Sequence, residues 1–489
     1  MSTDIVDLSG IIKAYDVRGV VPDTFDATIA RAIGAAFATV VVLPEAAPGS
    51  RPTAVVGHDM RDTGPELVAA FAAGLTAAGV DVVSIGLCST DGLYHASGAH
   101  DVPGAMFTAS HNPAEYNGIK LCRKGARPVG QDSGLAEVRD LAGAYLGGAQ
   151  QPVTATAPGS LTERSTLSDY ASFLRSLVDL RGIRPLKVVV DAGNGMGGYT
   201  VPAVLGSAAG LDALPLDVVP LYFELDGTFP NHEANPLEPE NLRDLQAAVV
   251  EHGADLGLAF DGDADRCFVI DERGEPVSPS AITALVGLRE VARERALDDS
   301  RTPVVIHNLI TSRVVPDLLG AAGARTVRTR VGHSFIKAQM AEQDAVFGGE
   351  HSAHYYFRDF FFADTGMLAA MHVLAALGEQ PHPLSALAEM YEPYFASGEI
   401  NSRTADVPAA RARVVEAYVT QQGAGPVVVD ELDGLTVSHW DETPQWWFNL
   451  RASNTEPLLR LNVEAADEDI MVKVRDDVLA LVRAEDEDA

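Results

Sequence analysis

The chain has 489 residues, 47% of them hydrophobic and 21% charged, and a formal net charge of −32 at pH 7. This length exceeds what one core supports and indicates about three or four domains, while the ordinary globular composition excludes gross disorder. The acidic balance argues against nucleic acid or an anionic membrane as a partner, so any phosphate site must be a local cluster of basic residues.

Cysteine usage and the N-terminus both indicate a cytoplasmic protein. Cys88, Cys122 and Cys267 form neither a disulfide framework nor a paired-cysteine metal site, which fits a reducing compartment. The first ten residues, MSTDIVDLSG, lack the basic n-region of a signal peptide. The longest apolar stretch, Ala32 to Leu43, is too short to span a bilayer, so we expect no membrane partner.

Three successive segments repeat an alternation of apolar runs and helical periods, which is typical of α/β units with mixed or parallel sheets. Their opening strands begin near residues 53, 187 and 303, and this spacing indicates a threefold duplication of one domain. In chain order the predicted elements are strand 53–57, helix 66–78, strands 82–85 and 105–108, strand 187–191, helices 199–205 and 240–252, strand 256–260, strand 303–306, a helix after 312, strand 325–329, helix 334–342 and strand 345–347.

The last segment has a different pattern, a helical stretch followed by several β-rich runs and a final helix. The predicted elements are helix 383–391, strands 427–428, 435–437, 446–449 and 458–463, and helix 468–483. Plausible linkers lie at 147–159 and 378–383. The predicted fold is therefore three similar α/β domains with mixed sheets and a smaller C-terminal α+β domain, with bounds 1–155, 156–273, 274–385 and 386–489.

The segment 105–120 takes an apolar run into a small polar loop. Pro113 has no N–H and biases the residue before it away from helix, so the strand cannot continue far. The loop should be exposed and present the Ser110 hydroxyl, the His111 imidazole and the Lys120 ammonium group. We predict that Ser110 is a nucleophile that carries a phosphoryl group, and that His111 is not its base.

A second loop follows the apolar strand 256–260 and reads DGDADR. Asp261, Asp263 and Asp265 lie at alternate positions in a glycine-containing turn and can converge on a hard divalent cation. An EF-hand is the poorer interpretation because Arg266 stands where that pattern requires glycine. A polar surface turn and an aspartyl-phosphate nucleophile remain as alternatives, and Arg266 could grip a phosphoryl group as a planar fork.

Polar loops also end strands in the third and fourth segments. Glu350, Ser352 and His354 could face one side and bind sugar hydroxyls, whereas His333, beside a helix start, reads as structural on its own. In the fourth segment a tight turn of donors and hydroxyls suits a phosphate dianion, although a polar hairpin is the alternative. Its candidate residues are Arg451, Ser453, Asn454 and Thr455.

The stretch from Val188 to Gly198 matches G-x-G-x-x-G after a strand, with Asp212 and Asp217 near the distance expected for a ribose contact. The helix after it is short and soon reaches Pro202. We therefore interpret the glycines as a tight strand-to-helix turn and expect no nicotinamide cofactor.

Four motifs in this order, TASHNPAEYNGIK, DGDADR, GEHSAH and RASNTEP, together with the N-terminal KAYDVRG, resemble those of the α-D-phosphohexomutase superfamily. The resemblance runs nearly end to end. GEHSAHYYF is similar to the bacterial phosphomannomutase/phosphoglucomutase branch, while the glucosamine-phosphate branch would have GEQSGH. Ala353 and His351 depart from the residues common in this loop, which bears on hexose preference.

This resemblance implies four domains around a central cleft, one Mg²⁺ and a phosphoserine. It implies transfer of phosphate between O6 and O1 of a hexose through a hexose 1,6-bisphosphate, with mannose phosphate as the first expectation and glucose phosphate as the alternative. The resemblance makes Ser110 the phosphoserine and implies that Mg²⁺ binds Ser110, Asp261, Asp263 and Asp265. It assigns charge neutralisation to Arg18 and Arg266, and acid–base roles to Lys120, His333 and His354. It assigns sugar binding to Tyr15, Glu350 and Ser352, and phosphate binding to Arg451, Ser453, Asn454 and Thr455. A phosphatase or mutase that uses Asp261 or Asp263 as nucleophile, and a non-catalytic sugar-phosphate binder, are the rivals.

Overall fold

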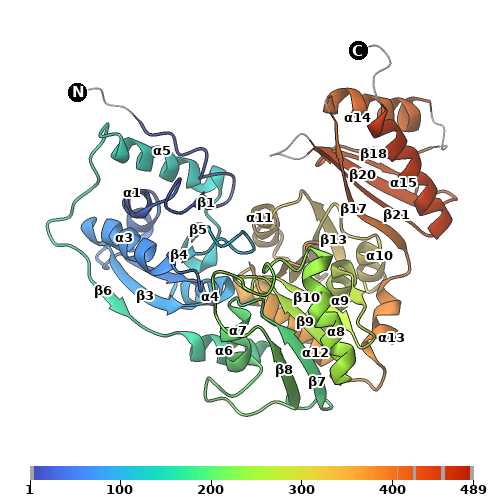
Figure 1. The fold of residues 1–489 in the computed structure, drawn as a ribbon, viewed down its shortest axis with the longest axis horizontal. Coiled ribbons are helices and arrows are strands. Elements are labelled where there is room, and N and C mark those ends of the chain that lie inside the picture. The colour runs from blue at the N-terminus through green and yellow to red at the C-terminus, as the bar shows by residue number, and fades with distance from the viewer. Residues whose placement is uncertain (1–4, 405, 422–425, 453–457, 485–489) are drawn as a thin grey trace. The chain divides into compact units, whose positions relative to one another are not determined.

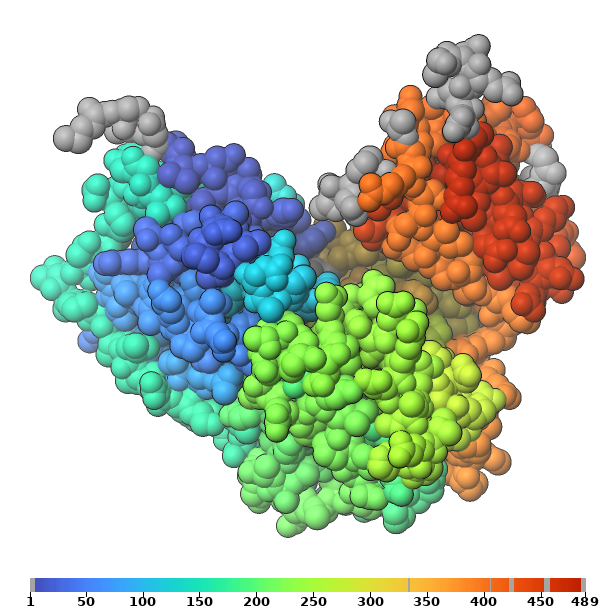
Figure 2. All heavy atoms as spheres, in the orientation of Figure 1, coloured from blue at the N-terminus to red at the C-terminus, as the bar shows by residue number. Residues whose placement is uncertain are grey.

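A computed structural model describes residues 5–404, 406–421, 426–452 and 458–484 (Figure 1). The chain divides into two compact units. Unit 1 runs to Val277 and takes in Met340–Phe347 and Ser352–Ser385, and unit 2 comprises Ser278–Gln339, Gly348–His351 and Ala386 onward. Within unit 1, the first segment (blue) and the second segment (green) are in direct contact in the space-filling view (Figure 2).

The first sheet has six strands in the order β1-β5-β4-β2-β3-β6. Strand β2 is parallel to β3 and β4, while β5 is antiparallel to β4 and β1. The strands are β1 (Val17–Val20), β2 (Thr53–His58), β3 (Asp81–Leu87), β4 (Gly104–Phe107), β5 (Tyr116–Cys122) and β6 (Leu161–Glu163). The helices are α1 (Ala27–Phe37), α2 (Leu43–Glu45), α3 (Gly64–Ala77), α4 (Thr90–His100) and α5 (Leu135–Leu146).

Helices α1, α3 and α5 contribute with the sheet to one hydrophobic core, which contains Phe37, Phe71, Phe107 and Val138. The helical stretch Ala27–Glu45 is 19 residues long and is the one stretch of the described chain with the length and composition of a membrane span. It is longer than the apolar stretch read from the sequence, and 56% of its most apolar window is buried. Its packing in this core is that of an internal helix.

The second sheet has the order β11-β10-β9-β7-β8, with β7 parallel to β8 and β9, and β9 antiparallel to β10. The strands are β7 (Leu186–Asp191), β8 (Leu216–Leu221), β9 (Leu256–Phe260), β10 (Cys267–Asp271) and β11 (Pro276–Val277), and the helices are α6 (Leu167–Leu177), α7 (Gly197–Val204) and α8 (Arg243–His252). Phe260 pairs with Cys267, so the DGDADR motif is the connection of the β9–β10 hairpin.

The glycine-rich stretch after β7 forms a tight turn into α7, as the sequence predicts. A Cβ at Gly195 would lie 2.7 Å from the Gly262 carbonyl oxygen, and one at Gly198 would lie 2.2 Å from that of Phe223. Both glycines therefore allow close backbone approach, one of them toward the DGDADR loop.

The third sheet has the order β13-β12-β14-β15-β16, with a parallel pair β12–β13 and an antiparallel pair β15–β16. The strands are β12 (Val304–Asn308), β13 (Arg325–Thr329), β14 (Phe347–Gly349), β15 (Tyr355–Phe357) and β16 (Ala363–Asp364). The helices are α9 (Pro279–Leu297), α10 (Val314–Ala321), α11 (His333–Gln343), α12 (Gly366–Gly378) and α13 (Leu384–Ala388).

The fourth sheet is antiparallel in the order β17-β21-β20-β19-β18. The strands are β17 (Phe395–Arg403), β18 (Val428–Asp430), β19 (Leu435–Ser438), β20 (Trp446–Ala452) and β21 (Leu458–Ala465), and the helices are α14 (Val407–Val415) and α15 (Glu468–Arg483). Both helices share one core with the sheet, around Phe448, Leu461 and Val478. Three mixed α/β sheets followed by a smaller antiparallel domain confirm the predicted fold class.

Candidate active site

The nucleophile loop, residues 109–116, leaves strand β4 and turns sharply at Ser110. Ser110 has φ +49°, in the left-handed region that costs a non-glycine residue about 1–2 kcal/mol. Its N–H donates to Thr108 Oγ1 at 2.8 Å, and its Oγ donates to Asp261 Oδ2 at 2.7 Å. The sequence predicts an exposed loop, but Ser110 is only 4% exposed. That prediction is wrong for the serine because the second domain covers it.

Arg61 holds this loop through its backbone. The guanidinium group donates to four carbonyl oxygens, those of Ser110 (3.0 Å), Asn112 (2.7 Å), Pro113 (2.7 Å) and Tyr116 (2.8 Å). Asp59 Oδ2 lies 3.3 Å from its Nε, and both side chains are buried. A strained backbone persists where the surroundings over-determine it, and Arg61 supplies that constraint.

Arg61 was not predicted from the sequence. The signal available was an Asp-x-Arg pair directly after the strand 53–57, in a chain where basic residues are scarce. That pattern alone did not indicate which loop the arginine would contact.

The metal loop, residues 261–266, gathers three buried carboxylates. Asp261, Asp263 and Asp265 each offer an oxygen that lies within 4.8 Å of the others. Gly262 makes the approach to the nucleophile loop possible, because a Cβ there would lie 2.3 Å from the Ser110 carbonyl oxygen. The two predicted loops, 151 positions apart at Ser110 and Asp261, therefore meet.

Cations from two elements neutralise these carboxylates. Lys120 Nζ, on β5, donates to Asp263 Oδ2 at 2.7 Å and to Asp265 Oδ2 at 2.6 Å. Burial acts to lower the pKa of Lys120, but the two carboxylates outweigh it and the pKa is raised. Arg266 Nε donates to Asp261 Oδ2 at 2.9 Å.

His111 is held as a neutral acceptor. Its Nδ1 lies 2.6 Å from Arg266 Nη2 and 3.2 Å from Ser110 Oγ. Burial, assisted by the Arg266 charge, lowers the pKa of His111 to about 2. A lowered pKa makes this imidazole a weak base, and that Ser110 does not use His111 stays a prediction.

The donor set of the metal loop fits a hard divalent cation. Asp263 Oδ1 and Asp265 Oδ1 are buried and have no hydrogen-bond partner among the described residues. Such oxygens are costly to bury unless something binds them, and carboxylate oxygens are the ligands that Mg²⁺ prefers.

Arg18 and His354, two other predicted residues of unit 1, contact these loops. Arg18 donates to Asn112 Oδ1 at 2.8 Å, and Tyr15, three positions earlier, is half-buried. His354 Nε2 lies 3.7 Å from Asp265 Oδ1, and its Nδ1 is 3.0 Å from Ser352 Oγ. The loop before β15 is therefore joined to the metal loop.

The remaining predicted residues belong to unit 2 or lie outside the described residues. Glu350 is buried and accepts from Asn308 Nδ2 at 3.1 Å and from the Gly332 N–H at 3.3 Å. Arg451 Nη2 donates to Glu399 Oε2 at 2.6 Å. His333 opens helix α11, and Ser453, Asn454 and Thr455 lie outside the described residues.

Four family models cover nearly the whole chain. They are phosphoglucomutase/phosphomannomutase alpha/beta/alpha domain I at residues 10–142, domain II at 168–274, domain III at 279–394 and the C-terminal domain at 399–481. The chain belongs to the phosphoglucomutase/phosphomannomutase family. It is an enzyme, a phosphohexose mutase, as the sequence motifs predict.

Similar proteins agree with this family over their full length. A phosphomannomutase of Salmonella montevideo is 40% identical over 465 residues, which cover 95% of this chain and 96% of that protein. The phosphohexose mutases of Xanthomonas campestris pv. campestris (strain ATCC 33913) are 39% identical over 468 residues, with 95% and 96% covered. A crystal structure of a phosphoglucomutase/phosphomannomutase family protein from Burkholderia thailandensis has a TM-score of 0.81 and 30% identity, and covers 98% of both chains.

Proposed function

We propose that this phosphohexose mutase interconverts mannose 6-phosphate and mannose 1-phosphate, with Ser110 as the residue that carries the phosphoryl group. The observation that carries the proposal is the 2.7 Å hydrogen bond from Ser110 Oγ to Asp261, inside a cluster of carboxylates and cations. Mannose is favoured over glucose because similar proteins at 36–40% identity are named phosphomannomutases. Phosphoglucomutase activity is the second candidate.

The proposed reaction begins from phosphoserine at position 110. The free O1 or O6 of a hexose monophosphate attacks phosphorus, the bond from Ser110 Oγ to phosphorus breaks, and a hexose 1,6-bisphosphate forms. The bisphosphate turns over in the site, and its other phosphoryl group returns to Ser110 Oγ. Enzymes of this kind supply mainly positioning and neutralisation of charge. We assign charge neutralisation to Arg266 and Arg18, which contact His111 and Asn112 of the nucleophile loop.

The attacking hydroxyl must also lose a proton, and Lys120, His333 and His354 are our acid–base candidates. Lys120 and His354 both contact the metal loop. Asp261, Asp263 and Asp265, with the Ser110 phosphate, would hold Mg²⁺, which when bound supplies Lewis-acid polarisation of the phosphoryl oxygens.

We assign sugar binding to Tyr15, Glu350 and Ser352, and binding of the non-reacting phosphate to the Arg451 segment with Ser453, Asn454 and Thr455. Arg451 is paired with Glu399, which is exposed, so that a phosphate arriving there would exchange with a solvent-accessible carboxylate. A cytoplasmic location accords with the three cysteines, which are buried and form no disulfide framework.

The test compares Ser110→Ala with Ser176→Ala, since the Ser176 hydroxyl binds only a carbonyl within its own exposed helix turn. Ser110→Ala should lower kcat at least about a thousandfold with an unchanged thermal midpoint, while Ser176→Ala keeps full activity. Wild-type kcat/KM should be higher for mannose 1-phosphate than for glucose 1-phosphate or glucosamine 1-phosphate. Full turnover by Ser110→Ala, or a phosphoenzyme that hydroxylamine cleaves, would refute the assignment in favour of an aspartyl phosphate.

A further inference from the structure

Helix α4 begins against the metal loop, although it belongs to the first domain. Its first residue, Thr90, is fully buried. Thr90 Oγ1 donates to Asp263 Oδ2 at 2.6 Å, and the Thr90 N–H donates to the Asp263 carbonyl oxygen at 3.0 Å. Thr90 therefore holds both the side chain and the backbone of one proposed metal ligand.

This pair of contacts decides which oxygen of Asp263 is available. Oδ2 accepts from Thr90 and from Lys120, whereas Oδ1 is buried without a hydrogen-bond partner among the described residues. A carboxylate fixed through one oxygen presents the other in a defined direction. Lys120 also donates to Asp265 and is itself an acid–base candidate. Thr90 is therefore the uncharged donor that holds Asp263 Oδ2 in place.

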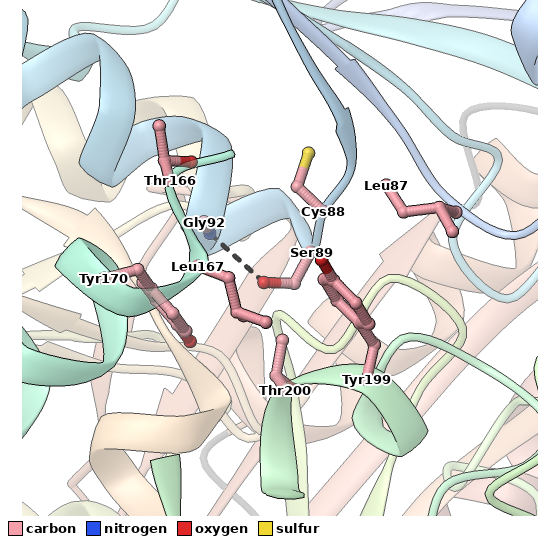
Figure 3. Close-up of a pocket in the computed structure, with 9 residues that line it drawn as sticks. All are labelled: Leu87, Cys88, Ser89, Gly92, Thr166, Leu167, Tyr170, Tyr199 and Thr200. Carbon is pink, nitrogen blue, oxygen red and sulfur yellow. Dashed lines mark hydrogen bonds between the residues drawn. The ribbon is translucent and has the colours of Figure 1, made fainter. Parts of the chain in front are cut away.

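The start of α4 is anchored on its other side as well. Ser89 caps the helix by accepting from the Gly92 N–H, and it faces α6 and α7 around a small pocket (Figure 3). The buried Asp91 carboxylate accepts from the hydroxyl groups of Ser89, of Tyr170 at 2.6 Å and of Thr365 at 2.6 Å. These three hydrogen bonds fix Asp91, the neighbour of Thr90. Thr90 therefore cannot move away from Asp263 unless hydrogen bonds to Asp91 break.

We propose that Thr90 is a positioning residue that orients Asp263 so that Oδ1 faces the divalent cation. The inference rests on the proposed function, in which Asp261, Asp263 and Asp265 hold that ion. It predicts that the Thr90 hydroxyl contributes to metal affinity and leaves hexose phosphate binding unchanged.

The experiment uses the isosteric change Thr90→Val, which removes the hydroxyl, and Thr90→Ser, which keeps it. Thr200→Val is the matched control, because Thr200 is equally buried and its hydroxyl binds the Met196 carbonyl oxygen. Calorimetric titration of the full-length phosphorylated enzyme with Mn²⁺ should show binding about 10- to 100-fold weaker for Thr90→Val. Thr90→Ser and Thr200→Val should stay within about twofold of wild type on that scale.

Kinetics supply a second readout. Thr90→Val should show lowered kcat at limiting Mg²⁺ that excess Mg²⁺ restores, with KM for the hexose phosphate unchanged. A residue that only supports the fold would lower activity at every Mg²⁺ concentration. If Thr90→Val does not fold, the comparison of Thr90→Ala with Thr90→Ser decides, since those two differ by the hydroxyl alone.

Asp263→Asn distinguishes a failure of the Thr90 proposal from a failure of the proposed metal site. Wild-type Mn²⁺ affinity in Thr90→Val, with loss of binding in Asp263→Asn, would overturn the role of Thr90 and leave the proposed metal ligands standing. Wild-type affinity in both variants would overturn the metal assignment of the proposed function as well. Weak binding in both supports the whole inference.

Discussion

The nucleophile loop and the metal loop meet at one point, yet they are held by different means. The nucleophile loop is fixed through its backbone, by the Arg61 guanidinium on four carbonyl oxygens. The metal loop is fixed mostly through its side chains, by Lys120, Arg266 and Thr90 on the three carboxylates, with backbone hydrogen bonds from Thr90 and Met196 in addition. The Ser110 hydroxyl is neutral, so its surroundings need only fix its orientation. The three carboxylates repel one another, so they need positive charges nearby before their orientation matters.

Asp91 shows what a buried carboxylate does when only hydroxyl groups hold it. Burial raises the pKa of Asp91 to about 6 in spite of three hydrogen bonds to it. Burial acts on Asp265 in the same direction, but Lys120 reverses it and the pKa of Asp265 is lowered. Lys120 therefore favours the charged forms of Asp263 and Asp265, whereas burial raises the pKa of Asp261 to about 7 even beside Arg266.

The largest expected effect comes from Arg61→Met, which leaves buried Asp59 without its partner. Removing one member of a buried ion pair costs about 3–5 kcal/mol, so urea unfolding should show a loss of this size. Arg61→Lys keeps the charge but cannot reach four carbonyl oxygens. It should speed amide exchange across residues 109–116 while Mn²⁺ affinity remains that of wild type. A stability of Arg61→Met within about 1 kcal/mol of wild type would contradict the backbone clamp.

Whereas Arg61→Met should mainly lower stability, Lys120→Met should mainly change activity and the response to Mg²⁺. Asp263 and Asp265 then repel each other without a counter-charge, and kcat should fall about a hundredfold as a charged group is lost from the site. Thermal shift assays should show a larger gain on adding Mg²⁺ than in wild type, because the ion replaces the missing charge. Lys473→Met, at an exposed position on α15, is the control. An equal Mg²⁺-induced thermal shift in Lys120→Met and Lys473→Met would contradict the view that Lys120 neutralises the metal loop.

Gly262→Ala tests the contact between the loops. Its Cβ would lie 2.3 Å from the Ser110 carbonyl oxygen, so one loop must move at a cost of about 1–3 kcal/mol. We expect a lowered unfolding midpoint and a lowered kcat. Gly320→Ala, where a Cβ meets nothing within 4 Å, should be neutral or stabilising. Wild-type kcat in Gly262→Ala would mean that the contact is not needed for turnover.

The smallest effect concerns the pH dependence of stability near α4. Asp91 binds its proton more tightly in the folded state, so its contribution to the free energy of unfolding falls as pH rises from about 4 to about 6. Burial lowers the pKa of His95 to about 4, so its contribution is lost as pH falls from about 6.5 to about 4. The two slopes oppose each other in one pH window.

Asp91→Asn should therefore leave a protein that loses stability more steeply on acidification, by on the order of 1 kcal/mol. His95→Phe should show the opposite slope, since only the Asp91 contribution remains. Urea unfolding at pH 4.5, 5.5 and 6.5 measures both. Parallel pH profiles for the two variants would show that neither group titrates as its burial implies.

The sequence predicted what is local and missed what is assembled from a distance. Alternating aspartates after an apolar strand identify the metal loop, and a proline after TASHN identifies the nucleophile loop, because each motif lies within a few residues. Thr90 and Asp263 are 173 positions apart, and Arg61 lies 49 positions before Ser110. No periodicity or motif encodes such a contact, since it depends on tertiary packing, between two domains for Thr90 and within the first domain for Arg61.

The secondary structure was also predicted only in part. Regular alternation of apolar runs predicted three mixed sheets, but strand β17 was missed because FASGEINSR is mostly exposed and contains a glycine. Helix α6 was also missed, although its Tyr170 reaches the buried Asp91. Helices α4, α5, α9 and α12 were missed as well, so the missed elements are not confined to exposed segments.

The joint at Asp91 also sets an order for the biosynthesis of the enzyme. Its donors come from positions 89, 170 and 365, so the last follows Asp91 by 274 residues. At roughly 5–20 residues per second, a ribosome adds Thr365 roughly 14 to 55 s after Asp91. The Ser110 and Asp261 loops are complete before then. The loops that bear Ser110 and Asp261 are therefore synthesised before the segment of the third domain that supplies the last donor to Asp91.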